Sequence, residues 1–246
     1  MSNPHVACSR VLVEQLCVAI GGLGLHTLMV DASEHAAARD DAATPDLSER
    51  LEHLSPRLSY LDARGTALHY IDSDGSAVGF LEAVVDAAPC ADVVLMHAAA
   101  SDLVRMFGRR PFGVDAPRAV ILCDEQPEAI IHAYAGLKLL ASHAGMVVHD
   151  LLLSAVTQSQ EAALVAARLA RCANRFFGAL QHRWVCIGPG DADGDVGNPA
   201  LRDLVEDLLL ATWTMPSAGA HSNTTSTGPS NLAAALPAFC HPPILN

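Results

Sequence analysis

Residues 10–31, RVLVEQLCVAIGGLGLHTLMVD, carry a helical pattern that leads directly into a strand pattern. The pattern predicts a helix over residues 10–23, and the glycines at positions 21, 22 and 24 supply its stop. The apolar run at residues 27–31 predicts a buried strand. Such alternation of helix and buried strand is typical of an α/β fold.

The same alternation continues along the rest of the chain. We expect strands at residues 58–61, 67–71, 93–96, 119–123, 146–154 and 184–187, and helices at residues 48–54, 77–87, 127–142, 160–177 and 199–210. Together they predict one doubly wound, mostly parallel sheet with helices on both faces. Residues 1–213 would form this α/β domain, and residues 214–246 a flexible polar C-terminal tail.

Composition excludes several classes of partner. The chain has 246 residues, 51% of them hydrophobic, which is enough for one large buried core. Fifteen basic residues against 27 acidic ones give a net charge of −12, which opposes binding to nucleic acid or to an anionic membrane. Acidic, basic or histidine residues interrupt every apolar run before the roughly 18 residues of a membrane helix. We therefore expect no nucleic-acid partner and no integral membrane segment.

The cysteine and lysine content limits which disulfide, metal and catalytic sites the chain can form. The seven cysteines are odd in number and contain no C-x-x-C pair, which is unlike a disulfide framework or a zinc ribbon. Glu14 and Gln15 interrupt the only stretch that resembles a signal peptide, so we expect a cytoplasmic protein. Lys138 is the single lysine beside 14 arginines, so any mechanism that needs a lysine must use it.

Three strings, in order, resemble the MinD/ParA family of deviant Walker (SIMIBI) ATPases, and most of all its FlhG (FleN) branch, which controls flagellar number and placement. The strings are LCVAIGGLGLHTLMVD at residues 16–31, PEAIIHAYAGLK at residues 127–138, and LLS at residues 152–154 with RFFG at residues 175–178. The resemblance spans about residues 2–210. It implies a fold like that of the P-loop NTPases.

The family's phosphate-binding loop is degenerate in this chain. Family members carry a Walker A loop, GKGGVGKT, whose glycines let backbone N–H groups face phosphates. The corresponding residues 3–10, NPHVACSR, contain neither glycine nor lysine. The resemblance places Ser9 at the loop lysine and Arg10 at the magnesium-binding Ser/Thr, and Pro4 removes an N–H donor. We therefore expect no nucleotide cradle.

The resemblance marks further positions at which the family's nucleotide chemistry is lost. Asp31 is retained, but the second aspartate of the family's DxD is Ser33, and the aspartate that ends the central strand is His97. The adenine-reading asparagine is Ser154. The family's nucleotide positions in this degenerate site are therefore Ser9, Arg10, Asp31, Ser33, His97 and Ser154, and of these only Asp31 keeps the family residue. The joint loss of the others predicts a pseudo-ATPase without catalytic residues or a cofactor.

Two histidines at former functional positions raise the question of a metal. His97 and His132, which replaces an aspartate of the second string, are expected at or near the carboxyl edge of the sheet, where α/β folds bind ligands. With Cys123 they would offer metal ligands. No i,i+4 ligand pair is present, however, and buried, hydrogen-bonded histidines are more common. We expect no metal site.

Three features are candidates for protein contacts. Arg168, Arg171 and Arg175 share one helical face, and they either complement the C-terminal helix dipole or form a docking surface for an acidic partner. A second group lies beside Phe107 and Phe112, at a segment that faces the dimer partner in family members. This second group consists of Arg105, Arg109 and Arg110. His132 is the third candidate.

The resemblance thus implies a non-catalytic scaffold that acts through protein contacts in bacterial flagellar biogenesis or its regulation. Implied partners are a flagellar GTPase, a switch-complex protein or a transcriptional regulator, together with a homodimer. Two alternatives stay open. One is a residual ATPase that binds ATP and magnesium through Arg10 and Asp31. The other is a ParA-like accessory subunit of another envelope machine, such as cellulose synthesis or pilus assembly.

Overall fold

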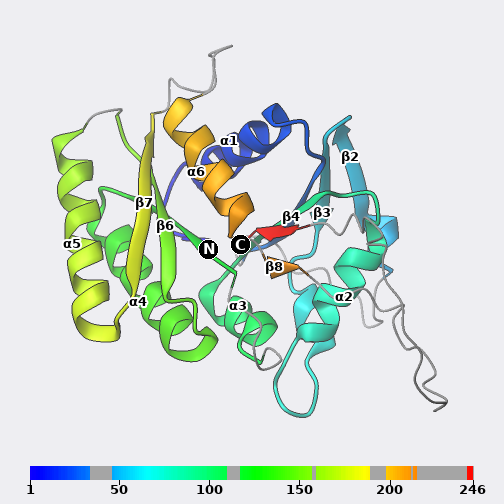
Figure 1. Ribbon diagram of the computed structural model, residues 1–246. Coiled ribbons are helices and arrows are strands. Elements are labelled where there is room, and N and C mark those ends of the chain that lie inside the picture. Colours follow the sequence, from blue (N-terminus) through cyan, green and yellow to red (C-terminus); the bar gives the residue numbers. More distant parts are fainter. Residues whose placement is uncertain are drawn as a thin grey trace, which may run out of the picture.

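The computed structural model describes residues 1–33, 46–109, 117–156, 159–188, 198–211, 213–214 and 243–245. It confirms an α/β fold of mostly parallel strands with helices on both faces (Figure 1). In chain order the elements are α1 (Ser9–Gly22), β1 (Thr27–Ala32), η1 (Leu47–Arg50), β2 (Leu51–Ser55), β3 (Leu58–Asp62), η2 (Thr66–Tyr70), α2 (Val78–Ala87), β4 (Val93–Ala98), α3 (Ala100–Phe107), β5 (Ala119–Asp124), α4 (Pro127–Ala144), β6 (Val148–Ser154), α5 (Gln160–Phe177), β7 (Leu180–Ile187), α6 (Pro199–Leu210), β8 (Trp213–Thr214) and β9 (Pro243–Leu245).

The described strands form two hydrogen-bonded groups, whereas the sequence predicted one continuous sheet. The larger group has six strands in the order β2-β3-β1-β4-β9-β8, and the smaller has three in the order β5-β6-β7. Strand β1 runs parallel to both β3 and β4, and β5, β6 and β7 are mutually parallel. Only β2 and β8 run antiparallel to their neighbours.

Residues 1–3 connect the two groups of strands. The backbone N–H of Ser2 donates to the carbonyl of Ala98 at the end of β4 (2.8 Å), and the nitrogen of Met1 donates to the carbonyl of Val120 in β5 (2.6 Å). Strand β9 adds to β4 on the side away from β1, where Ile244 pairs with Val94. The two groups are therefore joined by a short backbone segment instead of a continuous strand.

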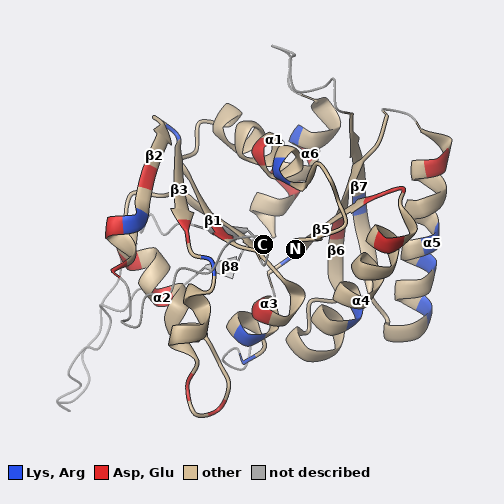
Figure 2. Cartoon of the chain, turned by 180° about the vertical axis from the view of Figure 1, so that it is seen from behind, with Lys and Arg blue, Asp and Glu red and all other residues tan. Residues whose placement is uncertain are grey.

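Helices cover both faces of the strands. Helices α1 and α6 pack against each other on one face, and α2, α3, α4 and α5 form a row on the other (Figures 1 and 2). The central strands β1, β4, β5 and β6 are almost wholly buried, and their apolar side chains fill the core, whereas β2 and β7 at the edges are largely exposed. Both layers are needed because such strands bury apolar side chains on each face.

Local signals in the sequence mark the ends of helices α4 and α5. Pro127 occupies the first turn of α4, and the side chain of Ser159 accepts a hydrogen bond from the N–H of Ala162 at the start of α5. Gly145 and Gly178 end these two helices with φ angles of +63° and +68°, a left-handed conformation that favours glycine. These ends fix where β6 and β7 begin.

Two of the predicted elements are wrong. Residues 67–71 form the 3-10 helix η2 instead of a strand, because Gly65 turns the chain with φ +69° and the following carbonyls bond locally. Residues 48–54 form the 3-10 turn η1 followed by β2 instead of a helix, because β2 pairs antiparallel with β3. Helix α3 was not predicted.

Some expectations fall on residues outside the described part of the chain. The predicted polar tail lies mostly at residues 215–242, which the structure does not describe. Among the helices described, none combines the length and the apolar composition that a bilayer crossing requires.

Gly108, directly after α3, lies against two backbone carbonyls. A Cβ atom there would stand 2.5 Å from the carbonyl oxygen of Val104 and 3.0 Å from that of His143. We expect Gly108→Ala to lower the free energy of unfolding by about 2 kcal/mol, because neither carbonyl moves without disturbing the packing of α3 on α4. Urea denaturation measures this. Gly21→Ala is the control, since a Cβ there meets nothing within 4 Å and alanine favours helix. Equal effects of the two changes would contradict the predicted clash.

Candidate functional site

Three polar residues form a row across neighbouring strands at the carboxyl edge of the larger group. Asp31 near the end of β1 stands in register with His97 on β4 and with Asp62 on β3. Ligands of parallel α/β sheets bind at this edge. The sequence predicted that His97 and His132 lie at or near this edge, and the structure places His97 there beside Asp31.

The carboxylate of Asp31 is engaged at both oxygens. Its Oδ1 accepts the backbone N–H of Ser33 (3.1 Å) and lies 3.3 Å from Nδ1 of His97. Its Oδ2 accepts the hydroxyl of Tyr60 (3.2 Å) and lies 4.0 Å from Nε of Arg64. Asp31 is thus the centre of a polar cluster, which we call the Asp31 cluster: Asp31, Ser33, Tyr60, Arg64 and His97.

Hydrogen bonding keeps Asp31 ionised. Burial by itself would raise the pKa of this carboxyl group, but the hydrogen bonds from His97 and Ser33 outweigh burial and hold the pKa well below its usual range. Burial and the charge of Asp31 raise the pKa of Tyr60. Asp31 is therefore a fixed negative charge that neighbouring donors stabilise.

His97 is positioned but inaccessible. Its Nδ1 faces Asp31, and its Nε2 is buried without a hydrogen-bond partner among the described residues. A carboxylate that orients an imidazole is the arrangement of a general base, but a general base must reach the proton of a substrate. The buried Nε2 makes this pair suited to holding β1 and β4 together rather than to proton transfer.

Residues 3–9, which the resemblance aligns with a phosphate loop, bond to one another and to β5 and α4. The side chain of Asn3 donates to the carbonyls of Leu122 and Ala129, both at 2.9 Å. The N–H of Val6 donates to the carbonyl of Asn3, and the N–H of Ser9 donates to the carbonyl of Val6. These N–H groups bond within the chain and do not face an open cradle.

Among the described residues, Ser9, Arg10 and Ser154 form no hydrogen bond or ion pair with the Asp31 cluster. Arg10 is exposed and pairs with Glu14 on its own helix at 2.8 Å, and the hydrogen bond and charge of Glu14, together with the charges of Tyr60 and Asp31, raise the pKa of the arginine. Ser9 begins α1 and is held by the turn just described. Ser154 ends β6 in the smaller group of strands, in register with Asp124. The structure thus joins Asp31, Ser33 and His97 but not the other three positions.

Two features of these residues oppose binding of a nucleotide with magnesium. Phosphate binding uses several free N–H groups at the start of a helix, and here the N–H groups of Val6 and Ser9 are already bonded. Arg10 is the residue that the resemblance aligns with a metal ligand, and a guanidinium group cannot bind a cation. Within the described residues, no group of three or more His, Cys, Asp or Glu side chains is placed to hold a metal.

Sequence reasoning missed Tyr60, Asp62 and Arg64. Arg64 forms a bidentate ion pair with Asp62, in which Nε lies 2.7 Å from Oδ1 and Nη2 lies 3.2 Å from Oδ2. A signal was present, because the predicted strand at residues 58–61 ends beside a carboxylate, as the strand at residues 27–31 does. Reading it would have required knowing that β3 pairs parallel with β1.

The predicted contact residues are distributed over several surfaces. Arg105 pairs with Asp102 on α3 at 2.6 Å, and Arg109 pairs with Asp74 at 3.1 Å. Phe107 is fully buried and presents no surface, and Arg110 lies outside the described residues.

The other contact candidates lie on α4 and α5. The ring of His132 on α4 meets the ring of His5 edge-on, with centroids 5.7 Å apart. The three arginines predicted to share a face, Arg168, Arg171 and Arg175, are all exposed on α5.

Comparison with known proteins adds no assignment. No protein-family model matches this sequence, and no curated protein is significantly similar to it.

Proposed function

We propose that this protein is a non-catalytic scaffold of the MinD/FlhG type, a pseudo-ATPase that acts through protein contacts in flagellar biogenesis or its regulation. The observation that carries the non-catalytic part is the bonded state of residues 3–9. Asn3 attaches this segment to β5 and α4, and its turns bond the N–H groups of His5, Val6 and Ser9 within the chain. The Asp31 cluster also supports the non-catalytic part, because the carboxylate of Asp31 bonds to donors of the protein itself.

The flagellar part of the proposal rests on the resemblance of residues 16–31, 127–138 and 152–178 to the FlhG branch. The proposed partners are a flagellar GTPase, a switch-complex protein or a transcriptional regulator, and a homodimer is part of the same proposal. Deleting the gene in its host tests this part. A change in the number or placement of flagella supports it, and unchanged flagella with a defect in cellulose or pili would favour another envelope machine.

A nucleotide titration tests the pseudo-ATPase part. Any ligand that binds the native state raises its melting temperature by mass action. We expect no shift with ATP, ADP or GTP at millimolar concentration, with or without magnesium, in thermal-shift and calorimetric measurements. A magnesium-dependent shift that disappears in Arg10→Ala would instead establish the residual ATP-binding alternative. Arg202→Ala is the matched control, since Arg202 pairs with Glu206 four residues on, as Arg10 pairs with Glu14.

A further inference from the structure

Helix α5 carries a basic surface that the helix dipole does not explain. Arg175 lies in the last turn, where a positive charge complements the dipole, but Arg168 and Arg171 lie further back in a helix that ends at Phe177. None of the described carboxylates forms an ion pair with Arg168 or Arg171. Figure 2 shows basic positions along α5 with an acidic position only near its start. In a chain of net charge −12, this grouping requires another reason.

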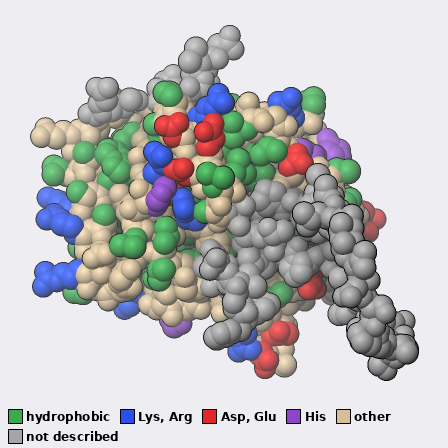
Figure 3. Space-filling view, viewed as in Figure 1, with side chains coloured by type: hydrophobic (Ala, Val, Ile, Leu, Met, Phe, Trp, Pro, Cys, Tyr) green, Lys and Arg blue, Asp and Glu red, His purple; other side chains and the backbone are tan. Residues whose placement is uncertain are grey.

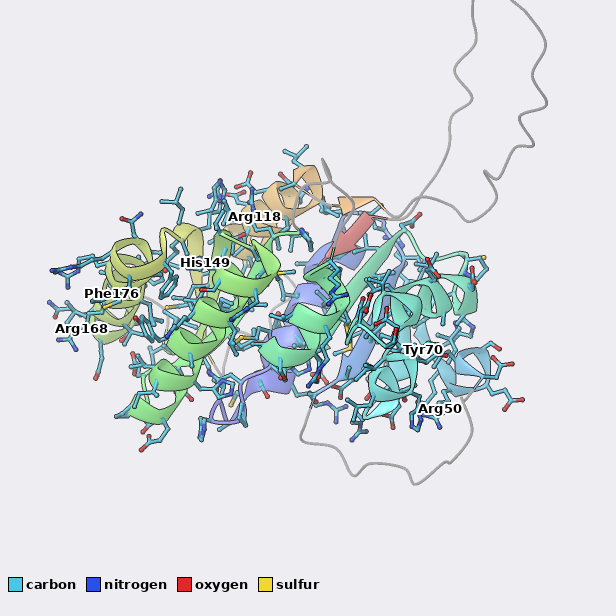
Figure 4. All side chains as sticks on the ribbon, turned by 90° about the horizontal axis from the view of Figure 1, so that it is seen from below. Arg50, Tyr70, Arg118, His149, Arg168 and Phe176 are labelled. Carbon is cyan, nitrogen blue, oxygen red and sulfur yellow. The ribbon has the colours of Figure 1, made fainter. Side chains whose placement is uncertain are left out.

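Large apolar side chains stand exposed beside these arginines. Phe176 is 67% exposed and Leu180, at the start of β7, is 54% exposed. Figure 4 shows Arg168 and Phe176 at the same outer side of the molecule, and in Figure 3 basic side chains project from the side that α5 forms. A hollow of about 680 Å³ lies between α5 and the start of β7, lined by Arg168, Arg171, Arg175, Phe176, Leu180 and Gln181 among others.

Strand β7 gives this hollow an open edge. It pairs with β6 on one side, and no other described strand pairs with it. Open edges are normally blocked by charges that point along the edge. Here the charged side chain of Arg183 turns to Asp207 on α6 and forms an ion pair with it. Within the described residues, the backbone N–H of Arg183 donates to Asp150 (2.8 Å) and the carbonyl of Cys186 accepts from the side chain of Asn198 (3.4 Å). The backbone that is available to an added strand therefore lies near the start of β7, beside the hollow.

We propose that α5 and β7 form a docking surface for an extended acidic segment of a partner protein, which adds as a strand beside β7. Backbone pairing with β7 supplies affinity, as in other cases of strand addition. An apolar side chain of the segment fills the hollow at Phe176 and Leu180, and its carboxylates meet the arginines of α5. This inference rests on the proposed function, because a scaffold needs a surface that binds its partner.

Charge argues against two other occupants. The chain contains no Asp or Glu after Asp207, so its own residues 215–242 offer no carboxylates to the arginines. A second copy that paired its β7 edge by two-fold symmetry would bring the arginines of both α5 helices to the same face of the joined sheet, where they repel. An acidic partner segment satisfies both the open edge and the arginines.

Fluorescence anisotropy of the full chain with synthetic peptides tests the proposal. The probe is a short labelled peptide in which Glu alternates with Val and Phe, and it is expected to bind more weakly as salt is added. Two comparison peptides separate the two components of binding. One has Gln in place of Glu, and the other is N-methylated at alternate residues so that it cannot pair with a strand. Both are expected to bind about tenfold more weakly or worse.

Variants of the protein locate the site. Arg168→Glu combined with Arg171→Glu is expected to weaken binding of the acidic peptide about tenfold or more. Phe176→Ser weakens it through loss of the apolar contact, and neither change removes a buried group, so folding is preserved. Arg202→Glu on α6 is the matched charge reversal, and it leaves affinity unchanged. Hydrogen exchange of the amides in β7 slows on binding.

Several results would overturn the docking surface. One is that the Gln or the N-methylated peptide binds as tightly as the acidic peptide, and another is that Arg202→Glu weakens binding as much as the α5 variants do. The surface is also rejected if a single-stranded oligonucleotide binds more tightly than the peptide, or if no peptide binds. None of these results depends on nucleotide binding. If no nucleotide shifts the melting temperature and no peptide binds, the docking surface is rejected while the pseudo-ATPase proposal stands.

Discussion

Replacing Asn3 with alanine is expected to lower the free energy of unfolding by about 3 kcal/mol. Asn3 is buried, and its amide group donates to the carbonyls of Leu122 and Ala129 while its Oδ1 accepts the N–H of His5. Truncation removes both bonds: the buried carbonyl of Leu122 loses the donor that Asn3 supplies, and the carbonyl of Ala129 keeps only its bond within α4. Urea denaturation at neutral pH measures the loss.

Two further variants make the Asn3 prediction specific. Asn3→Asp keeps the shape but turns a carboxylate toward two carbonyl oxygens, so it is expected to be worse than Asn3→Ala at neutral pH and to recover partly in acid, where the group can donate again. Ser2→Ala leaves the backbone bond of Ser2 to Ala98 in place and is expected to have a much smaller effect. A loss of stability in Asn3→Ala no larger than in Ser2→Ala would show that Asn3 does not hold residues 3–9 in place.

His149 on β6 is expected to make stability fall as the pH falls. The ring is 1% exposed, neither nitrogen has a hydrogen-bond partner among the described residues, and burial lowers the pKa of His149 to about 4. Figure 4 shows His149 and Arg118 between α5 and α6. Between about pH 6.5 and pH 4 the unfolded chain binds a proton at this position and the folded chain does not. Across that range the folded state is expected to lose about 3 kcal/mol.

Urea denaturation between pH 7.5 and pH 4 measures the free energy of unfolding at each pH and so tests the His149 prediction. His149→Leu removes the titration and two unpaired nitrogens, so it is expected to flatten the profile and to cost no stability at neutral pH. The neighbouring Asp150 acts in the opposite direction, because burial raises its pKa against the charge of Arg118. The comparison is therefore between the two proteins at each pH. His69→Gln, at an exposed position, is the control, and identical slopes in all three proteins would contradict the prediction.

Most of the fold could be predicted from the sequence where a pattern was long and its end signals were local. Helices α4 and α5 each span 18 residues and end at a left-handed glycine, so the hydrophobic periodicity and the helix-end signals predict the same bounds. For short segments the local sequence does not determine the secondary structure. The apolar residues of η2 suit a strand or a tight helix equally well, and its conformation depends on the turn at Gly65. The pairing of β4 with β9 depends on residues far apart in the chain.

The part of the candidate site that lies at the ends of clearly patterned strands was predictable from the sequence. Asp31 and His97 end strands of clear pattern, so their common edge follows from parallel pairing. Tyr60 and Arg64 required the register of β3, which no local signal gives. The pairing of Arg10 with Glu14 was readable, because a residue and its neighbour four positions on share one face of a helix.

The place of β9 beside β4 has a consequence for the order of folding. Residues 94 and 244 pair directly, so this contact closes a loop that contains most of the chain. Contacts of such high sequence separation are slow to form, since the entropy of closing the loop is lost before the pairing stabilises anything. Until it forms, β4 has an unpaired edge of apolar residues, the kind of edge that pairs between molecules. We expect self-association during refolding to begin at β4.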